Sequence, residues 1–182
     1  LFSLGVQYLE LQLGFGPVAT GLAFLPVTLG IFGVSRIVPR LVALVGQPPL
    51  MLTGAAGMLV SFIWLSDLTT ASGYLDAFGP FLLNGLSAGL VFMPITSLVL
   101  SDVEHEHAGS VSGLLQTMQQ LGGAIGLAVI ASVYAANAVP GEFVPGVREA
   151  FLTSAALAAL AVLASLTLVV RRPRTAPAAE LD

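Results

Sequence analysis

The chain has 182 residues, of which 56% are hydrophobic and only 9% charged, and its mean hydropathy is +0.95. A water-soluble domain carries about 25% charged residues, so this composition excludes a soluble globular protein and makes lipid the solvent for most of the surface. The net charge of −4 without a basic patch excludes nucleic acid as a partner, and the absence of cysteine excludes disulfides and thiolate metal sites.

Six apolar segments, separated by short polar connections, predict an all-α integral membrane protein built as a six-helix bundle. Crossing about 30 Å of hydrocarbon takes about 20 helical residues, so we expect the first segment, which is shorter, to lack its start. The predicted helices are residues 1–13, 17–38, 48–66, 77–101, 108–136 and 149–170, and the polar residues 171–182 predict a disordered tail.

The arginines predict the orientation of the chain. Arg36 and Arg40 follow the second segment, and Arg171, Arg172 and Arg174 follow the last. Alternating topology puts all of these on one side, which the positive-inside rule assigns to the cytoplasm. We therefore expect a multi-pass protein of a bacterial plasma membrane with a cytoplasmic C-terminus.

Polar side chains are concentrated in two of the predicted helices. Segments 48–66 and 149–170 are nearly all apolar and are expected to face lipid, whereas 77–101 and 108–136 carry amides and hydroxyls that are costly in hydrocarbon and should face inward. Two interpretations remain open: hydrogen bonds between helices, or the lining of a translocation pathway. The residues concerned are Asn84, Thr96, Gln116, Gln119 and Gln120.

Glu10 is the carboxylate that lies within an apolar stretch. An acid inside the membrane suggests a proton carrier or the partner of a cationic substrate. Because Gly14 follows only four residues later, Glu10 is equally compatible with a place at the outer end of the helix, in contact with interfacial water.

Glycines and prolines in the apolar segments indicate close helix packing and kinks. Glycines spaced four residues apart permit close approach of two helices, and a proline inside a helix bends it. The residues expected in these roles are Pro26, Gly85, Gly89, Pro94, Gly122 and Gly126.

Other kinds of site find little support. Residues 102–107 are rich in acids and histidines, but we interpret them as a solvated loop that caps the following helix rather than as a metal site. Ser112 has no histidine at its own depth in the membrane, and no phosphate-binding loop is present, so we do not expect an enzyme.

The segments 8–17, 19–26, 89–96 and 108–126 together resemble the fourteen-helix drug/proton antiporter branch of the major facilitator superfamily. This resemblance covers nearly the whole chain and implies one half of the major facilitator fold, its last six helices. It further implies export of small amphipathic compounds by alternating access, with a proton gradient and no cofactor as the driving force. The implied partners are the lipid bilayer and a missing N-terminal half.

One loop departs from the family pattern. Arg40 and Gly46 match the family's cytoplasmic loop motif, but Ala43 stands at its acidic position, and Leu44 and Pro48 at later basic ones. The resemblance therefore does not extend to a charge-based latch in this loop. The alternative to a transporter is a polytopic membrane scaffold or sensor subunit that transports nothing.

Overall fold

The computed structural model describes residues 1–69, 71–101, 103–104, 106–137 and 144–170, and within these ranges the chain forms helices and no strand. Five stretches are long and apolar enough to cross a membrane: Pro17–Ser35, Gln47–Ser66, Tyr74–Leu100, Ala108–Asn137 and Gly146–Val170. The all-α membrane fold predicted from composition is thereby confirmed. The helices are α1 (Phe2–Gln7), the π-helix η1 (Tyr8–Gln12), α2 (Pro17–Ala23), α3 (Leu25–Ser35), α4 (Val38–Val45), α5 (Gln47–Ser66), α6 (Tyr74–Leu100), α7 (Ala108–Asn137) and α8 (Val144–Val170).

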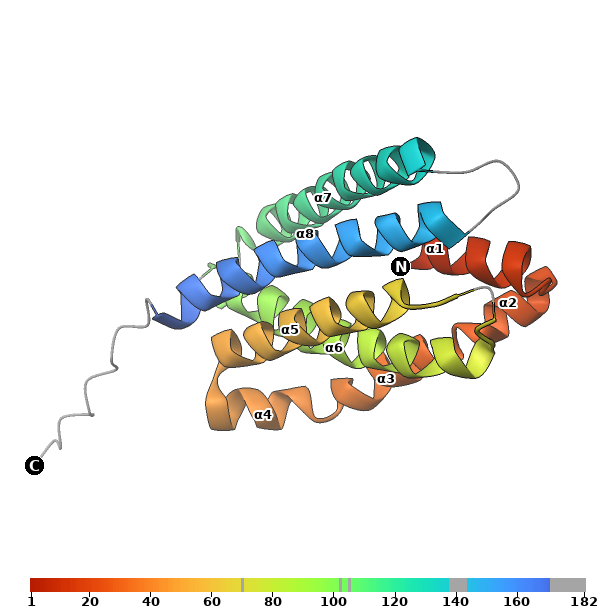
Figure 1. Cartoon of the computed structure of the whole chain (residues 1–182). Coiled ribbons are helices and arrows are strands. Elements are labelled where there is room, and N and C mark those ends of the chain that lie inside the picture. Colours follow the sequence, from red (N-terminus) through yellow and green to blue (C-terminus); the bar gives the residue numbers. More distant parts are fainter. Residues whose placement is uncertain (70, 102, 105, 138–143, 171–182) are drawn as a thin grey trace, which may run out of the picture.

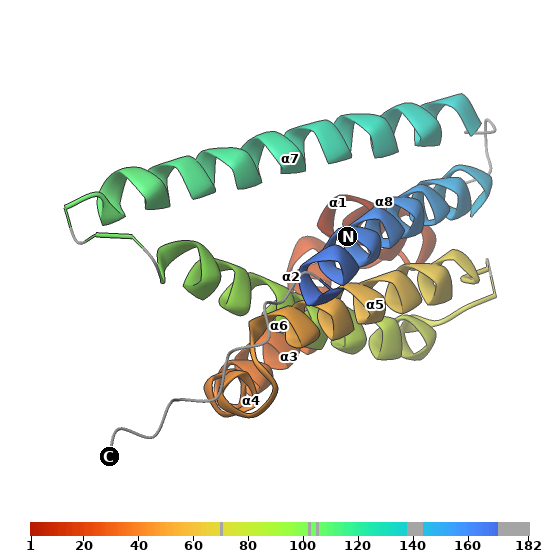
Figure 2. The same cartoon turned by 90° about the vertical axis from the view of Figure 1, so that its left-hand side faces the viewer.

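The long helices run side by side in alternating directions (Figure 1). The two ends of the bundle are named after residues that lie there. At the Tyr74 end, α6 and α8 begin and α5 ends; the Arg40 end holds α4 and the start of α5. The α5 helix packs along both α6 and α8, and α3 packs against α6. The α7 helix lies beside α8 at the edge of the bundle, on the side opposite α3 and α4 (Figure 2).

Several helix boundaries differ from those expected. The predicted helix 17–38 is divided into α2 and α3, and residues 38–45, most of them assigned to a connection, form α4, which ends at Gly46 with φ of 81°. The α6 helix begins at Tyr74 rather than 77, because the Asp76 carboxylate accepts the Gly73 N–H at 2.8 Å and caps the first turn. The tail 171–182 lies outside the described residues.

Pro26 coincides with the break between α2 and α3. A proline has no N–H for the helical ladder, and the next residue, Val27, donates its N–H to the Phe24 carbonyl at 3.1 Å instead of to Ala23. The Ala23 carbonyl is left outside the helical ladder by this shift. Pro94, by contrast, lies inside α6, which continues to Leu100.

The apolar core is gathered at the Tyr74 end. Phe24 stacks on Phe81 with ring centroids 5.1 Å apart, and the Phe2 ring, tilted against Phe24, lies 5.0 Å from it. The buried core residues are Leu4, Tyr8, Leu9, Ala23, Phe24, Val27, Leu65, Leu68, Ala77, Phe81, Val147, Ala150 and Phe151. This cluster joins α1, η1, the α2–α3 break, α5, α6 and α8 into one tightly packed layer.

Small residues set the distance between α6 and its neighbours. A Cβ on Gly85 would collide with the Val27 carbonyl oxygen, and one on Gly54 would lie 2.8 Å from the Ser87 carbonyl oxygen. The expectation that 48–66 and 149–170 face lipid was therefore wrong for one side of each helix. The glycines of α5 admit α6, and α8 packs along α5 and buries Phe151, while Val60, Trp64 and Leu163 remain exposed. Gly122 and Gly126 of α7 have open space around them.

Candidate functional site

Two neighbouring cavities follow α6 from the aromatic core toward the Arg40 end. The first, the Asn84 cavity, has a volume of about 390 Å³, and the second, the Thr96 cavity, about 700 Å³. Both are lined by Phe92 and Met93, which places them next to each other along α6. The Asn84 cavity is lined by Leu1, Phe2, Val27, Ile31, Met58, Phe62, Asn84, Ala88, Gly89, Phe92 and Met93.

The wall of the Asn84 cavity is mostly apolar and can adapt its shape to a ligand. Methionines contribute flexible, polarisable thioethers that adapt to ligands of different shape, and the aromatic rings offer flat apolar surfaces. Asn84 is the polar side chain among the described lining residues. Concave, mostly apolar sites with a few placed polar groups are typical of small-molecule binding.

The amide of Asn84 is held in one orientation. Its side chain is only 4% exposed, and its Nδ2 donates a hydrogen bond to the Ser61 Oγ at 2.8 Å. The Ser61 hydroxyl donates its single proton to the Met58 carbonyl at 3.1 Å, so toward Asn84 it acts as an acceptor. The Asn84 Oδ1 therefore remains as a hydrogen-bond acceptor.

Two hydroxyls of the Thr96 cavity, those of Thr96 and Ser35, are likewise acceptors toward a ligand. Thr96 donates to the Phe92 carbonyl at 2.9 Å, and Ser35 donates to the Phe32 carbonyl at 2.7 Å, each within its own helix. Their protons are committed and their oxygen lone pairs stay available. The Thr96 cavity is lined by Ser35, Val38, Pro39, Val42, Gln47, Phe92, Met93, Thr96 and Ser97.

The glutamines of α7 are not brought to these cavities. Gln116 and Gln120 are exposed, Gln119 is half-buried, and α7 has no buried residue. None of the three glutamines lines either α6 cavity. Their role as an inward-facing wall stays a prediction.

Glu10 also lies apart from the cavities. It is exposed on η1, near the Tyr74 end, and makes no ion pair with any residue that the structure describes. The π-turn inserts one extra residue into the helix and closes with the Leu13 N–H on the Tyr8 carbonyl at 3.3 Å.

The loop residues that match the family motif lie at the Arg40 end. Arg40 is exposed on α4 beside Ala43, and Gly46 turns the chain from α4 into α5. Arg36 covers the Phe32 ring at 5.1 Å, a cation–π contact. Within the described ranges, which omit Asp102 and His105, no group of three or more acidic or histidine side chains is placed to hold a metal.

Sequence reasoning singled out Asn84 and Thr96 but not the residues that complete their surroundings. Ser61 appeared as an isolated hydroxyl in an apolar helix, and Met58 and Phe92 as ordinary apolar residues. A usable signal was present at Met58 and Ser61, which lie one helical turn apart on the same face of α5.

Comparison of the sequence with known proteins identifies the family to which the chain belongs. The chain is 38% identical over 156 residues to the cephamycin export protein CmcT of Amycolatopsis lactamdurans, covering 83% of this chain and 32% of that protein. It is 32% identical over 135 residues to the multidrug resistance protein Stp of Mycobacterium tuberculosis, with 73% and 25% covered. It is also 34% identical over 139 residues to the puromycin resistance protein pur8 of Streptomyces alboniger, with 73% and 27% covered.

The chain thus spans a third or less of the length of these curated relatives. The family model of the Major Facilitator Superfamily matches residues 1–127, which include the Asn84 cavity and the Thr96 cavity. This multi-pass membrane chain belongs to the major facilitator superfamily.

Proposed function

We propose that this chain is the C-terminal half of a proton-coupled exporter that moves small amphipathic compounds out of a bacterial cell by alternating access. Its relatives bear the names of an export protein and of drug resistance proteins, and their greater length leaves room for the N-terminal half. The driving force is the proton gradient across the plasma membrane, without a cofactor.

The observation that carries this proposal is the contrast between the two ends of the bundle. The aromatic core lies at the Tyr74 end, where a hollow of about 250 Å³ is lined by Tyr74 and its neighbours, whereas the larger cavities of about 390 and 700 Å³ follow α6 toward the Arg40 end. Exposed Arg36 and Arg40 support a cytoplasmic location for the Arg40 end, and for the C-terminus with it. A half whose two larger cavities lie toward the cytoplasmic end suits a protein that takes its substrate from the cytoplasmic side.

The cavities indicate the chemistry of the substrate. Their apolar walls match an amphipathic body, and the Asn84 oxygen and the Thr96 hydroxyl accept hydrogen bonds from N–H or O–H groups. No carboxylate occurs among the described lining residues, so a fixed positive charge on the substrate is tolerated but not required. Glu10 is assigned to proton coupling instead.

Efflux by the full-length protein in inverted membrane vesicles tests this function. Ethidium, which carries aromatic amine N–H groups, should accumulate when a proton gradient is imposed, and an uncoupler should abolish its accumulation. Asn84→Leu keeps the side-chain size but removes the acceptor, and the loss of one hydrogen bond of about 1 kcal/mol should raise KM about fivefold. Met58→Leu, in the same wall, should leave KM within about twofold.

Three results would contradict the proposal: no gradient-dependent accumulation by the wild type, accumulation that survives the uncoupler, or equal effects of the two substitutions. The alternative of a scaffold or sensor subunit is favoured by none of the contacts or cavities described above.

A further inference from the structure

Two tyrosines tie separate elements together at the Tyr74 end. The Tyr8 hydroxyl of η1 donates a hydrogen bond to the Ser72 carbonyl at 3.0 Å, in the connection before α6. The Tyr74 hydroxyl, at the start of α6, donates to the Ala23 carbonyl at 3.2 Å. These bonds join residues 64 and 51 positions apart in the chain.

The acceptor of the Tyr74 bond exists because of the break at Pro26. The Ala23 carbonyl is outside the helical ladder, since Val27 donates to Phe24 instead. The Tyr74 hydroxyl therefore satisfies a carbonyl that the break exposes, and it does so at the point where α2 can change direction relative to α3. The ring of Tyr74 lies between Phe15, at 6.1 Å, and Phe78, at 6.2 Å.

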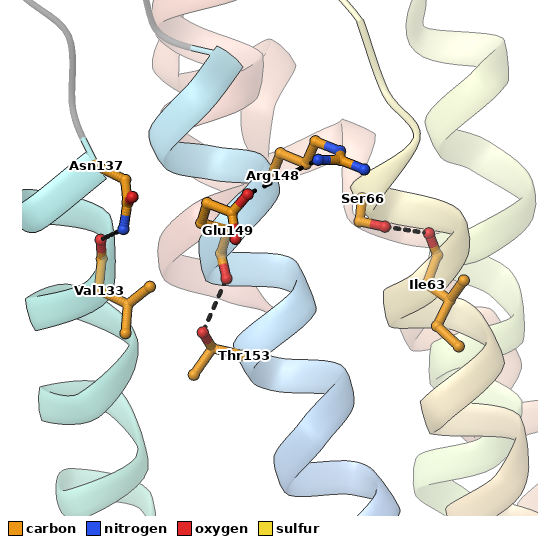
Figure 3. Close-up of polar contacts among 7 residues, drawn as sticks. All are labelled: Ile63, Ser66, Val133, Asn137, Arg148, Glu149 and Thr153. Carbon is orange, nitrogen blue, oxygen red and sulfur yellow. Dashed lines mark hydrogen bonds and ion pairs between the residues drawn. The ribbon is translucent and has the colours of Figure 1, made fainter.

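The polar contacts drawn in Figure 3 stay within single helices. Figure 3 shows Ser66 donating to Ile63, Asn137 donating to Val133 and Thr153 donating to Glu149, each within its own helix. The ion pair of Arg148 with Glu149, at 3.7 Å, joins neighbouring residues of α8. Among the residues drawn there, no polar contact links one helix to another, so the tyrosine bonds differ in kind.

We propose that Tyr8 and Tyr74 are the gate residues of the Tyr74 end. Their hydroxyls bind η1 and α2 to the start of α6 and hold this end closed. When both hydrogen bonds are released, α2 can change its direction at the α2–α3 break. This inference rests on the alternating access proposed above. Released tyrosine hydroxyls at the membrane interface find water as a partner, so the latch is reversible. A neutral hydrogen bond of this kind shifts a two-state equilibrium by roughly two- to tenfold.

Cysteine accessibility in the full-length protein measures this equilibrium. The chain has no cysteine, so single reporters can be introduced once any cysteine elsewhere in the protein is replaced. Ala77→Cys lies in the closed core at the Tyr74 end, and Ser97→Cys lines the Thr96 cavity. Membrane-impermeant maleimide is applied to the Tyr74 face in cells or to the Arg40 face in inverted vesicles.

The double variant Tyr8→Phe, Tyr74→Phe keeps both rings and removes only the hydroxyls. We expect the labelling rate of Ala77→Cys to rise about tenfold and that of Ser97→Cys to fall, since opening one end closes the other. Each single variant should shift both rates in the same directions by a smaller factor. Thr53→Val is the matched control, because the Thr53 hydroxyl bonds within α5, to Leu50 at 2.9 Å, and it should change neither rate.

The possible outcomes distinguish failure of the tyrosine latch from failure of alternating access, on which the latch rests. Unchanged rates in the double variant, equal shifts in Thr53→Val, or faster labelling of Ala77→Cys with Ser97→Cys unaffected would overturn the latch, the last by showing local loosening only. Wild-type rates that do not respond to an imposed proton gradient or to ethidium would instead refute alternating access.

Discussion

A single methyl group placed at Gly30 tests the contact between α3 and α6. A Cβ at this position would lie 2.7 Å from the Leu86 nitrogen, 2.9 Å from the Leu82 oxygen and 3.0 Å from the Gly85 carbonyl carbon. All three are backbone atoms of α6, so no side-chain rotation can relieve the collision. Gly33, one turn further along the same helix, has no atom within 4 Å of its built Cβ.

The two positions should respond to alanine with opposite signs. Inserting a methyl group into a tight contact destabilises a protein by about 1–3 kcal/mol, and at Gly30 the helix propensity that alanine gains offsets about 1 kcal/mol of this cost. At Gly33, alanine improves helix propensity by about 1 kcal/mol and meets no obstacle. The gain in helix propensity is common to both variants, so their free energies of unfolding should differ by the collision term alone, about 1–3 kcal/mol.

Thermal unfolding of the purified full-length protein in detergent, followed by circular dichroism, measures this difference. At about 2–4 °C per kcal/mol for a unit of 150–250 residues, the melting temperatures of the two variants should be roughly 2–12 °C apart. Melting temperatures within about 2 °C of each other would refute the close approach of α3 and α6 on which the position of the Asn84 cavity depends.

Two further predictions concern transport by the full-length protein. Glu10→Gln removes the exposed acid of η1 and should reduce proton-coupled efflux severalfold; dye export that is unchanged across external pH in vesicles would reject the coupling role. Gln116→Leu should alter the range of exported compounds more than the expression level, because Gln116 is exposed; equal losses of both would favour a packing role.

The membrane character and the helical spans could be predicted because they depend on local properties. Each span needs about 20 apolar residues in one stretch, and the strong apolar runs from Gln47 to Ser66 and from Ala108 to Asn137 meet that need wherever they lie in the bundle. Helix ends were predicted less well where capping or turn chemistry decides them, as at Asp76 and Gly46.

Rotation of the helices about their own axes was harder to predict. The low polarity of α5 is typical of a lipid-facing helix, but glycine and alanine also pack well against another helix. Gly54 and Gly57 let α6 approach closely enough for Asn84 to reach Ser61 at 2.8 Å. A polarity count cannot show this, because the same small residues would be harmless on a face turned toward lipid.

The sequence by itself determined three things: that the chain is a membrane protein, which residues form its helices, and which family pattern it carries. Hydropathy and turn chemistry act over a few neighbouring residues, so both can be read without the fold. Only the tertiary structure decided which polar groups meet. The bonds from Tyr8 to Ser72, from Tyr74 to Ala23 and from Asn84 to Ser61 join residues 64, 51 and 23 positions apart. Such pairs depend on how the helices cross and rotate, which many weak contacts settle together.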